Sequence, residues 1–134
     1  MGDGELMQIA AEARKKAYAP YSGCFVGAAL LAEDGRVFTG CNIENASYTP
    51  TNCAERTAFF KAVSEGVHRF SAIAVCGGYG DTVEPICAPC GVCRQVMAEF
   101  CSPDFRVILG EPECVQVYRL DELLPLSFTL KSEG

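Results

Sequence analysis

Three cysteines at the predicted starts of two helices constrain this chain more than any other feature. Cys53 begins a helix predicted from Cys53 to Glu65, and Cys90 and Cys93 lie in the first turn of a helix predicted from Pro89 to about Phe100. A helix N-terminus presents unpaired N–H groups and the positive end of the helix dipole, and both stabilise a thiolate. Because thiolates bind zinc, a fold that brings the two helix starts together creates a metal site.

The cysteine spacing alone leaves three kinds of metal site open. Cys53, Cys90 and Cys93 with water in the fourth position form an open, catalytic zinc site. If Cys87 also binds, the site is a closed four-thiolate zinc site of the structural kind. Cys87, Cys90 and Cys93 also begin the spacing of a bacterial ferredoxin, but Met97 stands where that pattern needs its fourth cysteine.

The two residues that follow Ala54 favour the open, catalytic site over the other two. Glu55 can reach a metal-bound water without binding the metal, and a carboxylate there can move a proton of that water. Arg56 can donate hydrogen bonds to the ligand sulfurs, which offsets the net negative charge of three thiolates around one zinc ion.

Composition excludes several classes of protein. The 134 residues suit a single domain spanning 1–134, and a net charge of −6 makes nucleic acids and acidic membranes poor partners. The single histidine, His68, excludes metallohydrolases that need two. An odd number of cysteines, nine, and an N-terminus without a basic and apolar signal sequence predict reduced thiols and a cytoplasmic location.

Helices and strands are predicted to alternate, which indicates an α/β fold with three α/β/α layers and a mixed five-stranded sheet. A hairpin opens the sheet, because Glu33-Asp34-Gly35-Arg36 joins two apolar runs. We expect Asp3 to cap the first helix and Asn52 or Thr51 to cap the second. The predicted helices span residues 4–18, 53–65, 89–100 and 120–124, and the predicted strands span 25–32, 37–43, 70–76, 105–109 and 115–118.

Four stretches of the sequence together resemble cytidine deaminase of the small pyrimidine-salvage type, in the same order and spacing over about residues 18–128. They are Gly40-Cys41-Asn42-Ile43-Glu44-Asn45-Ala46, Cys53-Ala54-Glu55-Arg56-Thr57-Ala58, Pro89-Cys90-Gly91-Val92-Cys93-Arg94-Gln95 and Glu122-Leu123-Leu124-Pro125. The resemblance implies the cytidine deaminase fold, one zinc ion per chain bound by Cys53, Cys90 and Cys93, and Glu55 as the catalytic proton shuttle. The implied reaction is hydrolytic deamination of cytidine and deoxycytidine to uridine and deoxyuridine, with release of ammonia.

The same resemblance implies how the nucleoside is held. Asn42 and Glu44 are expected to bind the ribose hydroxyls, and Ala54 is expected among the substrate contacts. Tyr48 and Phe128 match aromatic positions that the family contributes across a subunit interface. The implied assembly is a homotetramer with shared active sites.

Two positions depart from the family pattern. Cys24 replaces the aromatic residue that stacks on the pyrimidine, and an aromatic ring, Phe25, follows one place later. Neighbouring strand residues point to opposite faces, so Phe25 can reach the base only through a bulge, which Gly23 makes plausible. We expect that bulge and therefore count Phe25 among the substrate contacts. Ala88 replaces a serine that is common in the family, so a hydroxyl contact is missing there.

Two alternative functions stay open, one close to this function and one that is not enzymatic. A deaminase of the same fold can act on a cytosine-bearing antibiotic such as blasticidin S, although Asn42 and Glu44 favour a plain ribose. A structural four-cysteine zinc or iron–sulfur module would have no enzymatic activity.

Overall fold

The computed structural model describes residues 1–130, and its helices and strands follow the predicted order. None of the helices in this part of the chain is long and apolar enough to cross a membrane. The elements are α1 (Asp3–Arg14), β1 (Cys24–Ala32), β2 (Val37–Cys41), α2 (Ala54–Ser64), β3 (Phe70–Tyr79), α3 (Gly91–Phe100), β4 (Arg106–Glu111), β5 (Cys114–Arg119) and α4 (Leu120–Leu123).

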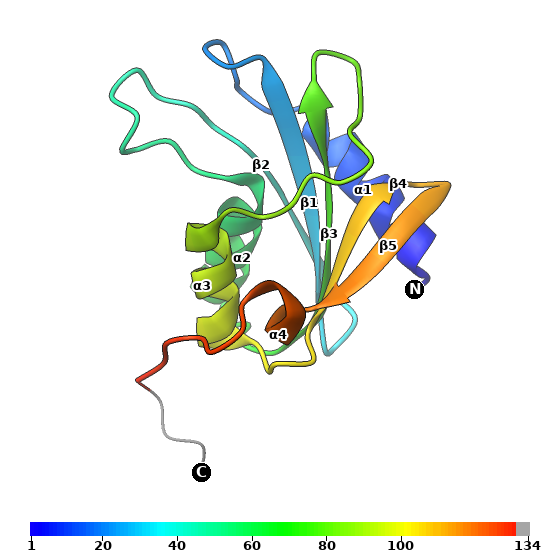
Figure 1. Cartoon of the computed structure of the whole chain (residues 1–134), viewed down its shortest axis with the longest axis vertical. Helices are drawn as coiled ribbons and strands as arrows, with labels where there is room; N and C mark the ends of the chain where they lie inside the picture. The colour runs from blue at the N-terminus through cyan, green and yellow to red at the C-terminus, as the bar shows by residue number, and fades with distance from the viewer. Residues whose placement is uncertain (131–134) are drawn as a thin grey trace.

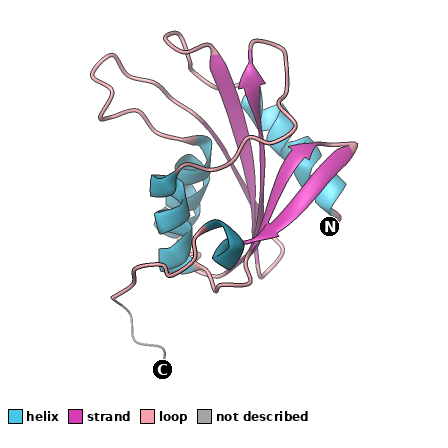
Figure 2. Cartoon of the chain, viewed as in Figure 1, coloured by secondary structure: helices cyan, strands magenta, loops and turns pink. Residues whose placement is uncertain are grey.

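The five strands form one mixed sheet in the order β2-β1-β3-β4-β5. β1 is antiparallel to both β2 and β3, β3 is parallel to β4, and β4 is antiparallel to β5. A parallel pair needs a crossover, and α3 provides it between β3 and β4. Figure 1 and Figure 2 show α1 on one face of the sheet and α2, α3 and α4 on the other. The predicted three-layer α/β/α arrangement is confirmed.

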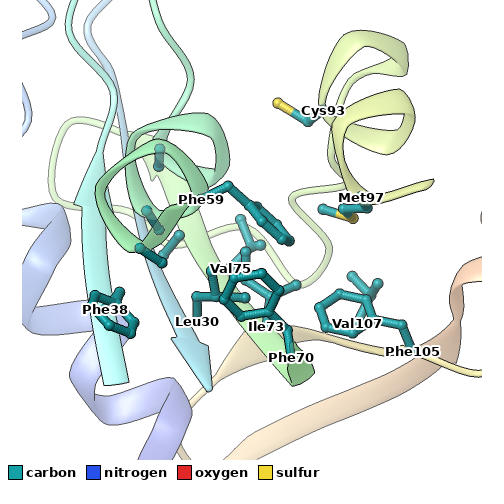
Figure 3. Close-up of a cluster of buried hydrophobic side chains, with 14 of the residues drawn as sticks. Leu30, Phe38, Phe59, Phe70, Ile73, Val75, Cys93, Met97, Phe105 and Val107 are labelled. Carbon is teal, nitrogen blue, oxygen red and sulfur yellow. The ribbon is translucent and has the colours of Figure 1, made fainter. Parts of the chain in front are cut away.

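Two clusters of buried side chains join the sheet to its helix layers. On one face, Leu6 and Met7 of α1 pack with Ala29 of β1. On the other face, Phe59 of α2 lies at the centre of the cluster, and its ring meets the ring of Phe70 edge-on at 5.1 Å. Figure 3 shows this second cluster, with Cys93 at its border and the sulfur pointing from α3 toward α2. The metal-ligand candidates therefore lie against a packed core.

Alternate residues of β1 face the two helix layers. Ala28 and Leu30 belong to the cluster under α2 and α3, whereas Ala29 belongs to the cluster under α1. Because side chains alternate along a strand, Cys24 faces the α2 and α3 layer and Phe25 faces α1. This alternation decides which of the two residues can approach the metal-ligand candidates.

Helix α2 begins one residue later than predicted, and the expected caps are wrong. Cys53 itself is the N-cap, in place of Asn52 or Thr51. The backbone N–H and carbonyl of Asn52 both pair with Ile43, so this residue belongs to a bridge between loops and cannot cap the helix. Helix α3 begins two residues later than predicted, because its N-cap is Cys90 and its first residue is Gly91.

The ends of α1 and β3 also differ from the prediction. The helix ends at Arg14, because Tyr18 leaves the helical path to donate its N–H to the carbonyl of Asn42 at 2.9 Å. Its N-cap is Gly2 and not Asp3. Strand β3 continues through Gly77 and Gly78 to Tyr79, pairing with the first residues of β1, where the sequence predicted a loop after Cys76.

Candidate metal centre

Three cysteine sulfurs from two helices lie close together beside the buried core. The Sγ atoms of Cys53, Cys90 and Cys93 all lie within 4.8 Å of one another. Cys53 Sγ is 3.8 Å from Cys90 Sγ, which is 3.5 Å from Cys93 Sγ. Cys93 is buried, Cys53 is half-buried and Cys90 is exposed. The cluster is therefore anchored on the core side and open on the other.

The two N-cap positions explain why these sulfurs converge. Cys53 and Cys90 both have extended backbone angles, and their carbonyls accept the first helical hydrogen bonds, from Thr57 and Arg94. Each side chain therefore projects from the start of its helix, where the dipole is positive. Cys93 follows Cys90 by three residues and so lies on the same side of α3.

The electrostatics of the cluster favour thiolate at Cys53. A hydrogen bond from the Cys93 thiol is the main cause that lowers the pKa of Cys53 to about 5; burial opposes it, and a hydrogen bond from Arg56 lowers the pKa further. Cys93 donates to that sulfur, so its own pKa is raised. Three sulfurs with one already deprotonated near neutral pH suit a thiophilic divalent cation such as zinc, so the donor set fits the metal.

Glu55 is the one buried charged side chain among the described residues, at 4% exposure. It lies in the first turn of α2, two residues after Cys53. Burial raises the pKa of its carboxyl to about 7, and the negative charge of Cys53 acts in the same direction. A carboxyl in this environment can both hold and release a proton at neutral pH.

Arg56 lies beside the cluster on the side of Cys53. Its Nη2 donates to Cys53 Sγ at 3.2 Å. Its Nε is buried and has no hydrogen-bond partner among the residues that the structure describes. The guanidinium thus brings positive charge to the ligand sulfurs, as predicted for a neighbour of three thiolates.

Cys87 does not join the three sulfurs in the described part of the chain. Its Sγ lies over Gly77 of β3, next to Val26 of β1. Burial raises the pKa of this thiol to about 12, so it stays protonated at neutral pH. The arrangement is that of an open three-thiolate site and not of a closed four-thiolate one.

The side chains of Asn42 and Glu44 hold the backbone near the start of β1. Asn42 Oδ1 accepts from the Val26 N–H and its Nδ2 donates to the Cys24 carbonyl, both at 2.8 Å. Glu44 accepts hydrogen bonds from the backbone N–H groups of Tyr21 and Ser22, and also from the Ser22 hydroxyl. The Ser22 contact lowers the pKa of this carboxyl, so Glu44 is ionised at neutral pH.

The two expected aromatic contacts are exposed in this chain. Tyr48 is 77% exposed, in the loop before α2, and Phe128 is 67% exposed near the C-terminus. The Phe128 carbonyl accepts a hydrogen bond from Gln95 of α3 at 2.9 Å, which ties the C-terminal segment to the ligand helix. Ala54 is fully buried at the first position of α2, between Cys53 and Glu55.

The expected bulge at Phe25 is wrong. Cys24 pairs with Tyr79 and Phe25 with Gly78 in regular register, and the single shift along this pair of strands lies at Leu31 and Ala32. Phe25 instead lines a hollow of about 300 Å³ on the α1 side, together with Arg14 and Lys15. Within one chain, the ring is therefore on the opposite face of the sheet from the cysteine cluster, and Cys24 is on the same face.

Two residues that support the ligands were not predicted from the sequence. Thr57 Oγ1 lies 3.2 Å from the Cys53 carbonyl and 3.1 Å from the Cys41 carbonyl, and thus links α2 to the end of β2. Arg94 donates from Nε to the Pro89 carbonyl at 2.8 Å, next to Cys90. Both lie inside the motifs that carry the ligands, but their partners are backbone atoms, which leave no signal in a sequence.

A family model, curated sequences and solved structures that resemble this chain all include cytidine deaminases. A family model described as the cytidine and deoxycytidylate deaminase zinc-binding region matches residues 2–109. The chain is 58% identical over 126 residues to a cytidine deaminase of Sporosarcina psychrophila, covering 93% of this chain and 90% of that protein. A crystal structure of cytidine deaminase from Burkholderia pseudomallei matches with a TM-score of 0.87 and 49% identity, covering 96% of this chain and all of that one. A blasticidin-S deaminase of Bacillus cereus is 32% identical over 131 residues, covering 95% of this chain and 92% of that protein.

Proposed function

The chain belongs to the cytidine and deoxycytidylate deaminase family, and from that premise we propose that it hydrolyses cytidine and deoxycytidine to uridine and deoxyuridine with release of ammonia. The observation that carries the proposal is the group of three thiols, open on one side, with a buried carboxyl two residues from one of them. The higher identity to a cytidine deaminase than to a blasticidin-S deaminase supports a nucleoside as the substrate.

Cys53, Cys90 and Cys93 would hold one zinc ion per chain. When bound there, zinc supplies Lewis acidity that allows a water molecule to ionise near neutral pH. Arg56, which already donates to Cys53 Sγ, would offset the negative charge of the three thiolates.

Glu55 carries the proton transfers in this proposal. Its carboxylate accepts a proton from the attacking water and delivers it to N3 of the pyrimidine, which makes C4 more electrophilic. After the water oxygen has added to C4, the carboxylate takes the remaining proton from that oxygen and delivers it to the exocyclic amino group. The C4–N bond then breaks, ammonia leaves and C4 becomes a carbonyl, while N3 keeps the first proton. The burial of Glu55 excludes bulk water from this exchange.

Asn42 and Glu44 would bind the ribose hydroxyls. Each already makes hydrogen bonds to the backbone near the start of β1, which fixes its orientation. Glu44 retains acceptor capacity, since an ionised carboxylate has about four lone-pair sites, and Asn42 retains one N–H donor. A carboxylate at this place also disfavours a substrate that carries a phosphate on the sugar.

We extend the proposal to the assembly and the cellular role. Tyr48 and Phe128 are exposed in the single chain, which leaves both rings accessible to a neighbouring subunit of a homotetramer with shared active sites. All nine cysteines are free thiols, which suits a reducing cytoplasm and a role in pyrimidine salvage. Residues 1–134 would act as one domain. Sedimentation analysis tests the assembly, since a species other than four chains contradicts it.

The test of function is the loss of absorbance near the cytidine band after zinc-loaded protein is mixed with cytidine. Ammonia release measured in parallel confirms hydrolysis of the C–N bond. Deoxycytidine and blasticidin S are tested in the same assay, and turnover of blasticidin S without turnover of either nucleoside would replace this proposal with the antibiotic one. A protein that binds zinc and turns over none of the three would be a structural module.

A further inference from the structure

Arg14, the last residue of α1, makes more hydrogen bonds to the backbone than any other side chain in the described hydrogen-bond network. Its Nε donates to the Phe25 carbonyl at 2.8 Å. Its Nη2 lies 2.9 Å from the Gly78 carbonyl, 2.6 Å from the Gly80 carbonyl and 3.0 Å from the Thr82 carbonyl. One guanidinium thus joins the start of β1, the end of β3 and the loop that follows.

Close packing of α1 on β1 places the guanidinium there. A Cβ at Gly27 would overlap the carbonyl of Ala10 and the amide of Arg14, so this position admits no side chain. The last turn of α1 therefore lies directly on the strand. The side chain of Arg14 leaves that turn toward the end of the sheet where β1 begins and β3 ends, and there it reaches the carbonyls of both strands.

The loop that Arg14 holds passes around the end of β3 to the metal-ligand candidates. Thr82 accepts from Arg14 on the α1 side, and Glu84 then donates its N–H to the Gly77 carbonyl at 2.8 Å. Cys87 lies on the other face, with its Sγ 2.7 Å from the place of a Cβ on Gly77. The fully buried Pro89 and then Cys90 follow.

We propose that Arg14 is a positioning residue for the metal site: by fixing residues 78–82 to the start of β1, it sets the path of the loop that presents Cys90 and keeps that ligand beside Cys53. Arg14 lies on the α1 face of the sheet and touches none of the three sulfurs. Its effect on them therefore passes through the loop. A forked guanidinium suits this role, because its Nε donates to β1 while its Nη2 donates to β3, whereas lysine has one nitrogen for both strands.

The test compares zinc-loaded Arg14→Gln and Arg14→Lys with the unchanged protein. The matched control is Lys15→Gln. Lys15 is the next residue in the chain, and its one ion pair among the described residues is with Glu12 of α1. Zinc release to a chromogenic chelator should be about tenfold faster in Arg14→Gln, intermediate in Arg14→Lys and unchanged in Lys15→Gln. Amide hydrogen exchange should accelerate in residues 80–88 and 23–26, and not in the core of α2.

These two measurements separate positioning from general stabilisation. If Arg14 only stabilises the fold in general, its substitution would lower the melting temperature and accelerate amide exchange in α2 as much as in the loop. That result would overturn the inference. Unchanged zinc release in both Arg14 variants would overturn it as well. If Arg14→Gln does not fold, Arg14→Lys alone decides, since it keeps the charge.

The inference rests on the proposed function only in treating the cysteine cluster as a zinc site. Neither measurement uses a nucleoside. A protein that binds zinc and does not deaminate cytidine would therefore contradict the proposed function and leave the role of Arg14 to be decided by zinc release.

Discussion

Glu55 differs from the other charged residues around the cysteines in being almost completely buried. We expect Glu55→Gln to keep the fold and one zinc per chain, because the amide has the same shape and Glu55 is not a ligand. Turnover of cytidine should fall by about 10²–10⁴-fold, the usual contribution of a general acid–base group. Zinc content and steady-state kinetics of the same preparation are the measurements, and a variant that keeps half its rate would remove Glu55 from the mechanism.

The cysteines divide into ligands and packing residues, and substitution by serine should separate them. Cys53→Ser, Cys90→Ser and Cys93→Ser should each lose zinc or stability, because serine is a poor zinc ligand at neutral pH. Cys87→Ser should keep its zinc, since this sulfur lies over Gly77 and outside the cluster. Zinc per chain is measured for all four variants, and loss of zinc from Cys87→Ser would point to a closed structural site.

Cys24 faces the layer of the metal site, whereas Phe25 faces α1. An aromatic contact is worth roughly 0.5–1.5 kcal/mol, so Cys24→Phe should lower KM for cytidine by about two- to twelve-fold. Phe25→Ala should instead reduce the free energy of unfolding by about 1–3 kcal/mol with little change in KM. A several-fold rise in KM for Phe25→Ala would mean that its ring reaches a substrate after all.

At the scale of single residues, local spacing correctly predicted that the three cysteines cluster. It did not predict the face of the sheet to which Phe25 points. The spacing of Cys90 and Cys93 is a property of one helix, so the sequence carries it directly. The direction of Phe25 depends on the register between β1 and β3, in which its partner Gly78 lies 53 places further along the chain. Gly23 allowed an irregular strand there, but pairing with Tyr79 and Gly78 keeps it regular.

At the scale of elements, each helix and strand was predicted, and the errors lie at their ends, several of them near the site. Asn52 has the composition of an N-cap, yet its backbone pairs with Ile43, and the helix start moves to Cys53. Glycines usually end a strand, yet Gly77 and Gly78 extend β3 because residues 82–87 pack against them. Tertiary contacts set these boundaries, and the helix and strand propensities of single residues carry no information about such contacts.

Gly77 offers a test of that packing. A Cβ at this position would lie 2.7 Å from Cys87 Sγ and 2.9 Å from Val26 Cγ2. Gly77→Ala should therefore lower the free energy of unfolding by about 1–3 kcal/mol, as overpacking does. Cys87→Ala removes the closer neighbour, so the double variant should recover part of that loss. Urea denaturation of the two single variants and the double variant gives the coupling, and strictly additive effects would show that the sulfur is not the obstacle.

At the scale of the whole molecule, the alternation of helices and strands was enough to predict the three layers and the mixed sheet. It could not predict contacts such as those of Arg14 with Gly78 and Thr82, which join residues 64 and 68 places apart. Backbone carbonyls look the same in every residue, so a side chain that binds them has no partner that a sequence can reveal. The contacts of Arg14, Thr57 and Arg94 with backbone carbonyls were for this reason found only in the structure. The contact of Arg56 with Cys53, in contrast, was predicted from the sequence.

The close approach of the three sulfurs makes metal loss a chemical event as well as a structural one. With Cys90 Sγ 3.5 Å from Cys93 Sγ, removal of two electrons and two protons by peroxide would join the pair as a disulfide after only a small movement. We expect chelator-treated protein to lose two titratable thiols in dilute peroxide and to regain its zinc only after a reductant is added, while zinc-loaded protein keeps all nine. Thiol titration before and after peroxide is the measurement, and equal losses from both forms would contradict it. Bound zinc would then also protect the sulfurs of its own ligands from oxidation. The time for which the protein can be stored in air would therefore depend on how much of it carries zinc.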